Sequence, residues 1–291
     1  MMTNTVMRGN LRAMVRGAYD LQKLRIEMGN RLVGNFKVRM GQAPGEKEEE
    51  MSAEGKEILA NLRAAYDKLT DGVVKFPRAS SFKGNEVISS FTELALVAQY
   101  LDLDKSEATH FGRLKHVLKD FAIYTQFLEE VRGVGPAMAG VIVAEIDITR
   151  AQYPSSLWKY AGLDVASDGV GRSRRKEHLV QVDYVNKAGE AANRVGLTFN
   201  PWLKTKLYVL ATCFIKAGGP YREIYDGYKH RLESIPQWAE RSKGHRHNAA
   251  MRYMTKQFLA DLYNAWRPLE GLPVAPSYAE GKLGIVHRQS A

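Results

Sequence analysis

The sequence predicts a mainly α-helical protein, in which long N-terminal helices form a coiled-coil-like arm. A helical domain with a helix-hairpin-helix motif and a small β-hairpin insertion follows. Three observations support this fold class. Apolar residues recur every three or four positions through residues 1–125. A Gly-Val-Gly-Pro sequence at 133–136 separates two apolar segments. Apolar and polar residues alternate in two short runs between 178 and 200, as in paired strands.

The N-terminal region contains four segments with helical periodicity: 8–40, 51–75, 86–101 and 111–124. The second is the clearest, because its apolar residues have the spacing of a coiled-coil seam: Ile58, Leu62, Ala65, Leu69 and Val73. Residues 41–50 predict a loop and residues 102–110 a turn. We expect residues 1–125 to form a helical arm. Its apolar stripes either mediate dimerisation or pack within the chain as an ordinary bundle.

The residue pattern of the C-terminal region is less uniformly helical. A short helix is expected at "SSLWKYAGL", followed by a glycine- and arginine-rich loop, "DVASDGVGRSRRKE". The runs "HLVQVDYVN" and "RVGLTFN" predict a β-hairpin, and helices resume after it. The last strong helix has an apolar stripe at Met254, Phe258, Leu262 and Trp266. We therefore expect a second domain at 126–270 and a tail at 271–291.

Composition limits the function. The 291 residues include 42 Lys and Arg against 32 Asp and Glu, a net charge of +10. Such an excess favours a polyanionic partner, most often nucleic acid, although a soluble basic protein could show it too. The single cysteine, Cys213, excludes a disulfide framework and lies in an apolar run that predicts burial. No apolar stretch reaches roughly 18 residues, so we expect no membrane span and a cytoplasmic location. We expect no metal and no cofactor.

The stretch "VRGVGPAMAGVIVAE" at 131–145 predicts two helices joined by a tight bend. Both glycines allow positive φ, and Pro136 suits the first position of the second helix. The free amides at the start of that helix, together with its dipole, form an anion site suited to a phosphate. The pattern is that of a helix-hairpin-helix motif, although such a bend could simply connect packed helices. The residues expected to contact the phosphate are Arg132, Gly133, Val134 and Gly135.

The glycine bend, the "YAGL" element, the glycine- and arginine-rich loop, "NPWLKTKLYVLATCFIKA" and "AMRYMTKQFLADLYNAWR" occur in a characteristic order. Over roughly residues 125–270, this order resembles the C-terminal domain of IS-one-ten-type transposases and Piv-type DNA invertases. The resemblance implies a protein that cuts and rejoins DNA as a dimer or higher oligomer, in some members guided by a structured RNA. It also implies an RNase-H-like domain with four acidic metal ligands.

The sequence departs from that family in its N-terminal half. An RNase-H-like domain needs an early apolar strand that carries an aspartate, and residues 1–125 show only helical periodicity. Asp102 and Asp104 lie in "YLDLDKS", which predicts a helix end. We therefore expect the metal-dependent part of the active site to be missing, with the N-terminal helices corresponding to the family's coiled coil. A partner chain could supply an RNase-H-like subunit.

The resemblance also implies a serine that attaches covalently to DNA, located after "YAGL" and next to a glycine. Ser167 and Ser173 both qualify. A serine needs a base or strong electrostatics to act as a nucleophile, and serines in glycine-rich loops are also ordinary turn residues. Basic side chains could surround a phosphoryl group and stabilise its charge. Those expected to bind nucleic acid are Arg172, Arg174, Arg175, Lys176, Lys204 and Lys206.

Three functions remain open from the sequence. The first is a transposase-related protein that binds DNA, or a structured RNA, chiefly through phosphates. The second is an active serine-dependent recombinase completed by a partner RNase-H-like subunit. The third is an α-helical interaction protein with no role in nucleic-acid binding.

Overall fold

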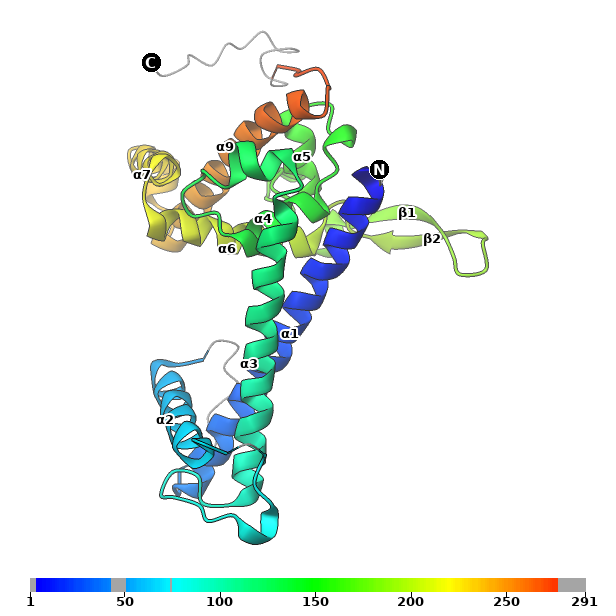
Figure 1. Cartoon of the computed structure of the whole chain (residues 1–291). Coiled ribbons are helices and arrows are strands. Elements are labelled where there is room, and N and C mark those ends of the chain that lie inside the picture. Colours follow the sequence, from blue (N-terminus) through cyan, green and yellow to red (C-terminus); the bar gives the residue numbers. More distant parts are fainter. Residues whose placement is uncertain (1–3, 43–50, 74, 277–291) are drawn as a thin grey trace. The chain divides into compact units, whose positions relative to one another are not determined.

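A computed structural model describes residues 4–42, 51–73 and 75–276 (Figure 1). These residues are mainly helical and include a two-stranded hairpin, so the predicted fold class is confirmed. The chain divides into two compact units, Ala13–Leu114 and Met1–Arg12 with Lys115–Ala291. Part of the predicted loop, 43–50, and most of the predicted tail, 277–291, lie outside the described residues.

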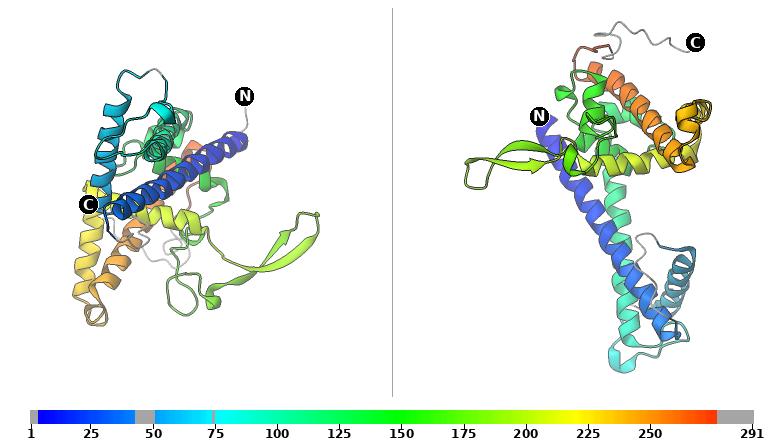
Figure 2. Two further views of the ribbon diagram at one scale, coloured as in Figure 1. Left: turned by 90° about the horizontal axis from the view of Figure 1, so that it is seen from below. Right: turned by 180° about the vertical axis from the view of Figure 1, so that it is seen from behind.

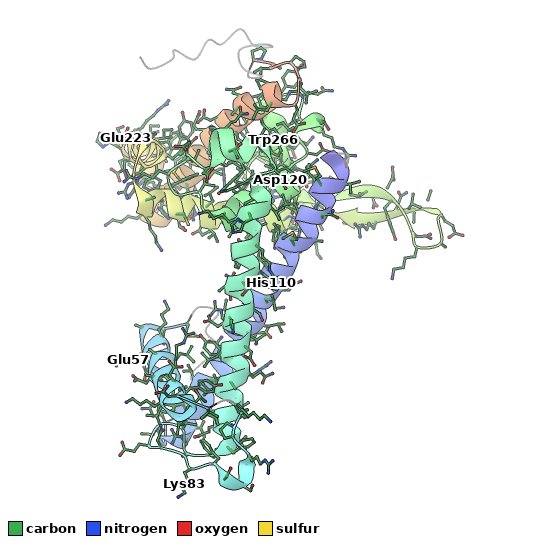
Figure 3. All side chains as sticks on the ribbon, viewed as in Figure 1. Glu57, Lys83, His110, Asp120, Glu223 and Trp266 are labelled. Carbon is green, nitrogen blue, oxygen red and sulfur yellow. The ribbon has the colours of Figure 1, made fainter. Side chains whose placement is uncertain are left out.

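Three helices build the unit Ala13–Leu114: α1 (Asn4–Arg39), α2 (Ala53–Thr70) and α3 (Phe91–Leu118). Their apolar stripes face one another and form a common core, while Glu57 on α2 points outward (Figure 3). The buried residues of this core are Met28, Leu32, Leu59, Leu62, Ala65, Ile88, Leu94, Val97 and Tyr100. The stripes of the predicted arm therefore pack within the chain, as the bundle alternative expects.

The turn predicted at 102–110 is wrong, because α3 runs through it without a break. The segment is polar but contains neither glycine nor proline, so nothing local ends the helix. Its carboxylates also have partners elsewhere in the unit. Arg63 donates to Asp104 at 2.6 Å, Gln22 donates to Glu107 at 3.0 Å, and Arg25 forms an ion pair with Glu107. The polar residues that indicated a turn thus lie on a face of α3 that forms hydrogen bonds and ion pairs with α1 and α2.

We call the other unit, Met1–Arg12 with Lys115–Ala291, the C-terminal unit. It includes a π-helical turn (Tyr124–Leu128), α4 (Pro136–Glu145) and α5 (Pro154–Tyr160). After the hairpin come α6 (Pro201–Ala217), α7 (Pro220–Glu233), the short α8 (Pro236–Ala239) and α9 (Lys243–Leu269). The long α9 packs against α5, α6 and α7, and α4 packs on α6. The predicted stripe of α9 is buried, and Trp266 lies among these packed helices (Figure 3).

The predicted β-hairpin is confirmed, with β1 (Val180–Val185) pairing antiparallel to β2 (Ala191–Gly196). Its turn is held by Asn186, whose side-chain oxygen accepts from the amides of Ala188 at 2.9 Å and Glu190 at 3.0 Å. Most strand side chains are exposed, and the hairpin projects away from the helices of its unit (Figure 2).

Two further expectations concern the burial of Cys213 and the possibility of a membrane span. Cys213 is half-buried, so its predicted burial is only partly correct. Among the described helices, none combines the length and the apolar character needed to cross a membrane.

Candidate nucleic-acid interface

The two glycines of the bend have different conformations. Gly133 has a φ of +97°, the positive value that the sequence predicts. Gly135 instead has an extended conformation, with φ −88° and ψ 169°, and forms the N-cap of α4. Pro136 occupies the first turn of α4, as expected. The prediction of positive φ is therefore correct for Gly133 and wrong for Gly135, because a single left-handed residue is enough to reverse the chain here.

One side of the bend is packed and the other is open. A Cβ at Gly133 would lie 3.0 Å from the Phe214 ring and 3.3 Å from the Cys213 carbonyl oxygen, so this residue abuts α6. Gly135 is exposed, with no atom within 4 Å of a Cβ position. Among the hydrogen bonds of the described residues, none uses the amide of Gly135 or Ala137. Arg132 is exposed beside them. The open side thus offers two amides and a guanidinium to an acceptor in solution.

A second basic region lies around the loop that follows α5. An isolated β-bridge between Val165 and Gly171 closes the loop. The guanidinium of Arg172 donates to one oxygen of Asp164 at 2.9 and 3.2 Å. Because Arg172 is held by Asp164 and is mostly buried, it shapes the loop as well as adding charge. Its backbone carbonyl accepts a hydrogen bond from the Lys204 ammonium on α6.

Two residues of α9 complete this region. The Arg252 guanidinium lies against Gly171, about 2.6 Å from where a Cβ would stand. Lys256 lies over the Trp158 ring at 5.3 Å. Burial and then the charge of Arg252 lower the pKa of Lys204 and of Lys256, and Asp164 offsets part of this effect. We call Arg172, Lys204, Arg252 and Lys256 the basic cluster. Three of these half-buried cations interact with one carboxylate, Asp164, and the charge of Arg252 opposes two of them, so a bound anion would relieve the repulsion.

The remaining predicted cations lie outside the cluster. Arg174, Arg175 and Lys176 are exposed on the loop that leads to the hairpin. Lys206, further along α6, lies over the Trp202 ring at 5.6 Å. These side chains increase the positive charge at the surface near the cluster without belonging to its packed part.

The two candidate serines occupy different environments. Ser167 is exposed near the tip of the loop, and its hydroxyl takes part in no hydrogen bond among the described residues. Ser173 is half-buried, and its Oγ lies 3.0 Å from Nδ1 of His178. The other ring nitrogen of His178, Nε2, lies 2.9 Å from Oδ2 of Asp168. The hydrogen bond from His178, followed by one from the Val170 amide, lowers the pKa of Asp168.

Sequence reasoning missed four residues of this region: Asp168, His178, Arg252 and Lys256. His178 follows Ser173 by five residues, and in a loop that separation does not determine whether the two side chains are in contact. It becomes a contact because a 3₁₀ turn, Lys176–His178, folds the histidine back and buries it. Arg252 is one basic residue among many in the sequence, and nothing local links it to a loop eighty positions earlier. The presence of a serine and a histidine in the same short loop is the sequence signal that could have pointed to His178.

The bend and the basic cluster contact different ends of α6. Gly133 abuts Cys213 and Phe214, near the C-terminal end, whereas Lys204 lies near the N-terminal end. Nine residues separate Lys204 from Cys213, which corresponds to about 14 Å along the helix axis. A single phosphate group is too small to contact both places.

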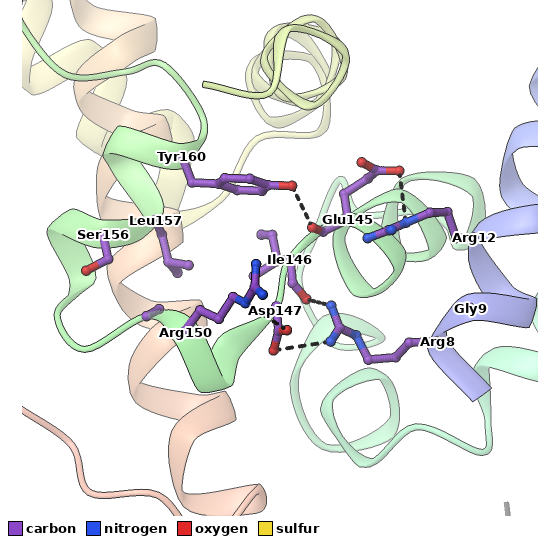
Figure 4. Close-up of a pocket in the computed structure, with 11 residues that line it drawn as sticks. Arg8, Gly9, Arg12, Glu145, Ile146, Asp147, Arg150, Ser156, Leu157 and Tyr160 are labelled. Carbon is purple, nitrogen blue, oxygen red and sulfur yellow. Dashed lines mark hydrogen bonds and ion pairs between the residues drawn. The ribbon is translucent and has the colours of Figure 1, made fainter. Parts of the chain in front are cut away.

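A separate hollow of about 610 Å³ lies at the C-terminal end of α4 (Figure 4). Arg12 donates to the Ala144 carbonyl at 2.9 Å, and Arg8 donates to the Ile146 carbonyl and pairs with Asp147 at 3.2 Å. The buried Glu145 accepts from Asn200 at 2.7 Å. Cations at a helix C-terminus interact favourably with its dipole. Arg8 and Arg12 therefore stabilise the end of α4.

A bend with free amides and a cluster of half-buried cations from the loop, α6 and α9 are both features that suit contact with a polyanion. Residues 125–205 match the model of the Transposase IS116/IS110/IS902 family. Over this segment the chain is similar to a C-terminal region of IS110-type transposases, and the resemblance noted in the sequence is confirmed there. A search of curated proteins found no match.

The matched segment includes the bend, α4, α5, the serine loop, the hairpin and the start of α6. Lys204 falls within it, whereas Lys206, Arg252 and Lys256 lie beyond it. The family domain supports a transposase-related role for the chain.

Proposed function

We propose that this chain binds nucleic acid through the phosphate backbone and serves DNA transposition or site-specific recombination, in the compartment that holds the DNA. The family domain supports the broad role. The basic cluster is the observation that carries the finer proposal, because its cations repel one another and share one carboxylate, Asp164. Half-buried like charges weaken a fold unless an anion binds them.

The bend supplies a second contact in this proposal. A phosphate oxygen would accept hydrogen bonds from the Gly135 and Ala137 amides at the start of α4, with Arg132 alongside. Along a duplex axis, where each strand carries one phosphate per roughly 3.4 Å, the separation of about 14 Å between bend and cluster corresponds to about four phosphates. One strand would therefore contact the two places through different phosphates. Contacts of this kind position a strand without reading its sequence.

The exposed loop cations Arg174, Arg175 and Lys176 flank the cluster in this arrangement, and Lys206 extends it along α6. Long flexible side chains at the edge of a charged site mainly raise the rate of encounter and its salt dependence. We therefore expect their removal to weaken binding less than removal of the packed cations does.

The test is a gel-shift titration over a range of salt concentrations, with duplex DNA, single-stranded DNA and structured RNA as separate probes. We expect affinity to fall steeply with salt. Lys256→Ala and Arg252→Ala should each lower the slope of log affinity against log salt by about 1. Lys83→Ala, which removes an exposed lysine of the other compact unit, is the matched control and should leave the slope unchanged.

Two results would count against the proposal: binding that does not depend on salt, or no binding to any of the three probes. Charge reversal at Arg174 and Arg175 without any effect would favour the alternative of a helical interaction protein. The preference among the three probes decides between DNA and RNA as the partner.

A second candidate function is that of a serine-dependent recombinase completed by a separate RNase-H-like subunit. The contact between Ser173 and His178 favours it over simple binding. The chain would act as a dimer or higher oligomer. Sedimentation of the chain with target DNA measures this oligomeric state. Incubation with supercoiled DNA and the partner subunit should yield a phosphoserine–DNA adduct that Ser173→Ala abolishes. Failure to form an adduct with any partner would leave binding as the function.

A further inference from the structure

Ser173, one of the two serines that the resemblance suggests, forms a hydrogen-bonded chain with His178 and Asp168, and neither the family match nor the sequence motifs assign a role to those two residues. Oγ of Ser173 lies 3.0 Å from Nδ1 of His178, and Nε2 of His178 lies 2.9 Å from Oδ2 of Asp168. The arrangement is that of a nucleophile, a base and a carboxylate that orients the base. It lies next to the basic cluster, because Lys204 binds the carbonyl of the residue that precedes Ser173.

The hydrogen bonds determine which nitrogen of His178 carries the proton. The backbone amide of Ser173 also points at Nδ1, at 2.9 Å. An amide can only donate, so Nδ1 must be the unprotonated nitrogen. Nε2 then carries the proton and donates it to Asp168. The lone pair of Nδ1 is shared by the amide and the hydroxyl of Ser173, and Nδ1 is the nitrogen able to take the hydroxyl proton if its bond to the amide gives way.

The surroundings hold this chain in place. His178 is 2% exposed, so the surrounding residues restrict its ring. Oδ1 of Asp168 accepts from the Val170 amide at 2.9 Å, which leaves Oδ2 for His178. The Arg175 amide points at Oγ of Ser173 from 3.3 Å and would favour negative charge there. Asp168 is the charged side chain that contacts His178 among the described residues. The loop's other charged residues, Arg174, Arg175, Lys176 and Glu177, are exposed.

We propose that His178 is the general base that activates Ser173 for attack on phosphorus, and that Asp168 is the positioning residue for His178. In the step, Oγ forms a bond to the phosphorus of a phosphodiester and the bond from phosphorus to one bridging oxygen breaks. The serine proton passes to Nδ1. The leaving oxygen becomes a hydroxyl by taking a proton from the imidazolium or from water. Asp168 neutralises the imidazolium in the meantime. The step requires no further reactant.

For its natural substrate this inference rests on the proposed function, so the test uses a probe that does not. A small alkyl fluorophosphonate reacts with an activated serine, forming the Oγ–P bond and releasing fluoride, while the serine proton passes to His178. We expect mass spectrometry to find the label on Ser173 and not on Ser167, the exposed serine of the same loop. The labelling rate should rise with pH, because the attack requires an unprotonated base beside Oγ.

His178→Asn is the decisive variant, since its side-chain oxygen can still accept from the Ser173 amide but cannot take up a proton. It should reduce the labelling rate by about 10²-fold or more and remove the pH dependence. Asp168→Asn should lower the rate less and shift the pH profile. If the melting curve shows that His178→Asn does not fold, Asp168→Asn still tests the proposal, because Asp168 is exposed and its replacement should disturb the fold less.

Gel shifts of the same variants separate the two proposals. Labelling of Ser173 without any nucleic-acid binding would overturn the proposed function and support the inference. Nucleic-acid binding with Ser173 no more reactive than Ser167 would overturn the inference, as would unchanged labelling and pH profiles in folded His178→Asn or Asp168→Asn.

Discussion

Gly133→Ala should destabilise the C-terminal unit by about 2 kcal/mol. The residue has a φ of +97°, and the left-handed region costs an L-residue roughly 1–2 kcal/mol. The added Cβ would also lie 3.0 Å from the Phe214 ring. That ring is fully buried and packs against Tyr221 and Phe258, with ring centroids 4.7 and 5.1 Å away, so it has little room to move. This crowding increases the cost of the strained backbone.

The assay is thermal unfolding followed by circular dichroism. For a unit of this size, each kcal/mol lowers the melting temperature by about 2–4 °C, so we expect a drop of about 4–8 °C. Gly135→Ala is the matched control. Its φ of −88° suits alanine and the space around it is open. The loss of a glycine N-cap and the reduced entropy of the unfolded chain oppose each other, giving a change within about 0.5 kcal/mol. Wild-type melting of Gly133→Ala, or an equal loss in both variants, would refute this reasoning.

Three further predictions concern stability. Asn200→Ala removes the N-cap of α6 and the 2.7 Å donor to Glu145, and should cost about 1–3 kcal/mol in urea unfolding. Burial raises the pKa of Asp147. The hydrogen bonds from Thr149 and the charges of neighbouring arginines lower it by a larger amount, so the net shift is downward. A lowered pKa stabilises the fold at neutral pH, and this contribution is lost as pH falls through the lowered value. Asp147→Asn should therefore melt with a weaker dependence on acid pH than wild type. Leu94→Ala empties a fully buried site in the core of the N-terminal helices and should cost about 2–5 kcal/mol, with hydrogen exchange rising in Ala13–Leu114.

The helices were largely predictable because their signals are local. The stripe that includes Leu62 and Ala65 needs only the spacing of neighbours along the chain, and both residues are buried. The hairpin was predictable for the same reason. The break expected at 102–110 was wrong because the sequence shows that Asp104 and Glu107 are polar, but not that arginines of other helices neutralise them.

The candidate site was predictable only in part. Glycine and proline punctuate a chain wherever they stand, so the bend at 133–136 was located from the sequence. Its two glycines look equivalent there, and only their packing separates the strained Gly133 from the extended Gly135. Similarly, two serines fitted the family pattern, and only the folded loop brings His178 to Ser173.

The sequence by itself determined the helical fold class, the hairpin, the position of the bend and the resemblance to a transposase family, since each follows from residue types at short spacing. Tertiary structure alone decided which serine lies beside a histidine and which cations gather. Gly171, Lys204 and Arg252 are far apart in sequence and meet only when α6 and α9 pack beside the loop. Contacts of this kind depend on the whole fold, because distance in space is set by how helices pack and not by separation along the chain.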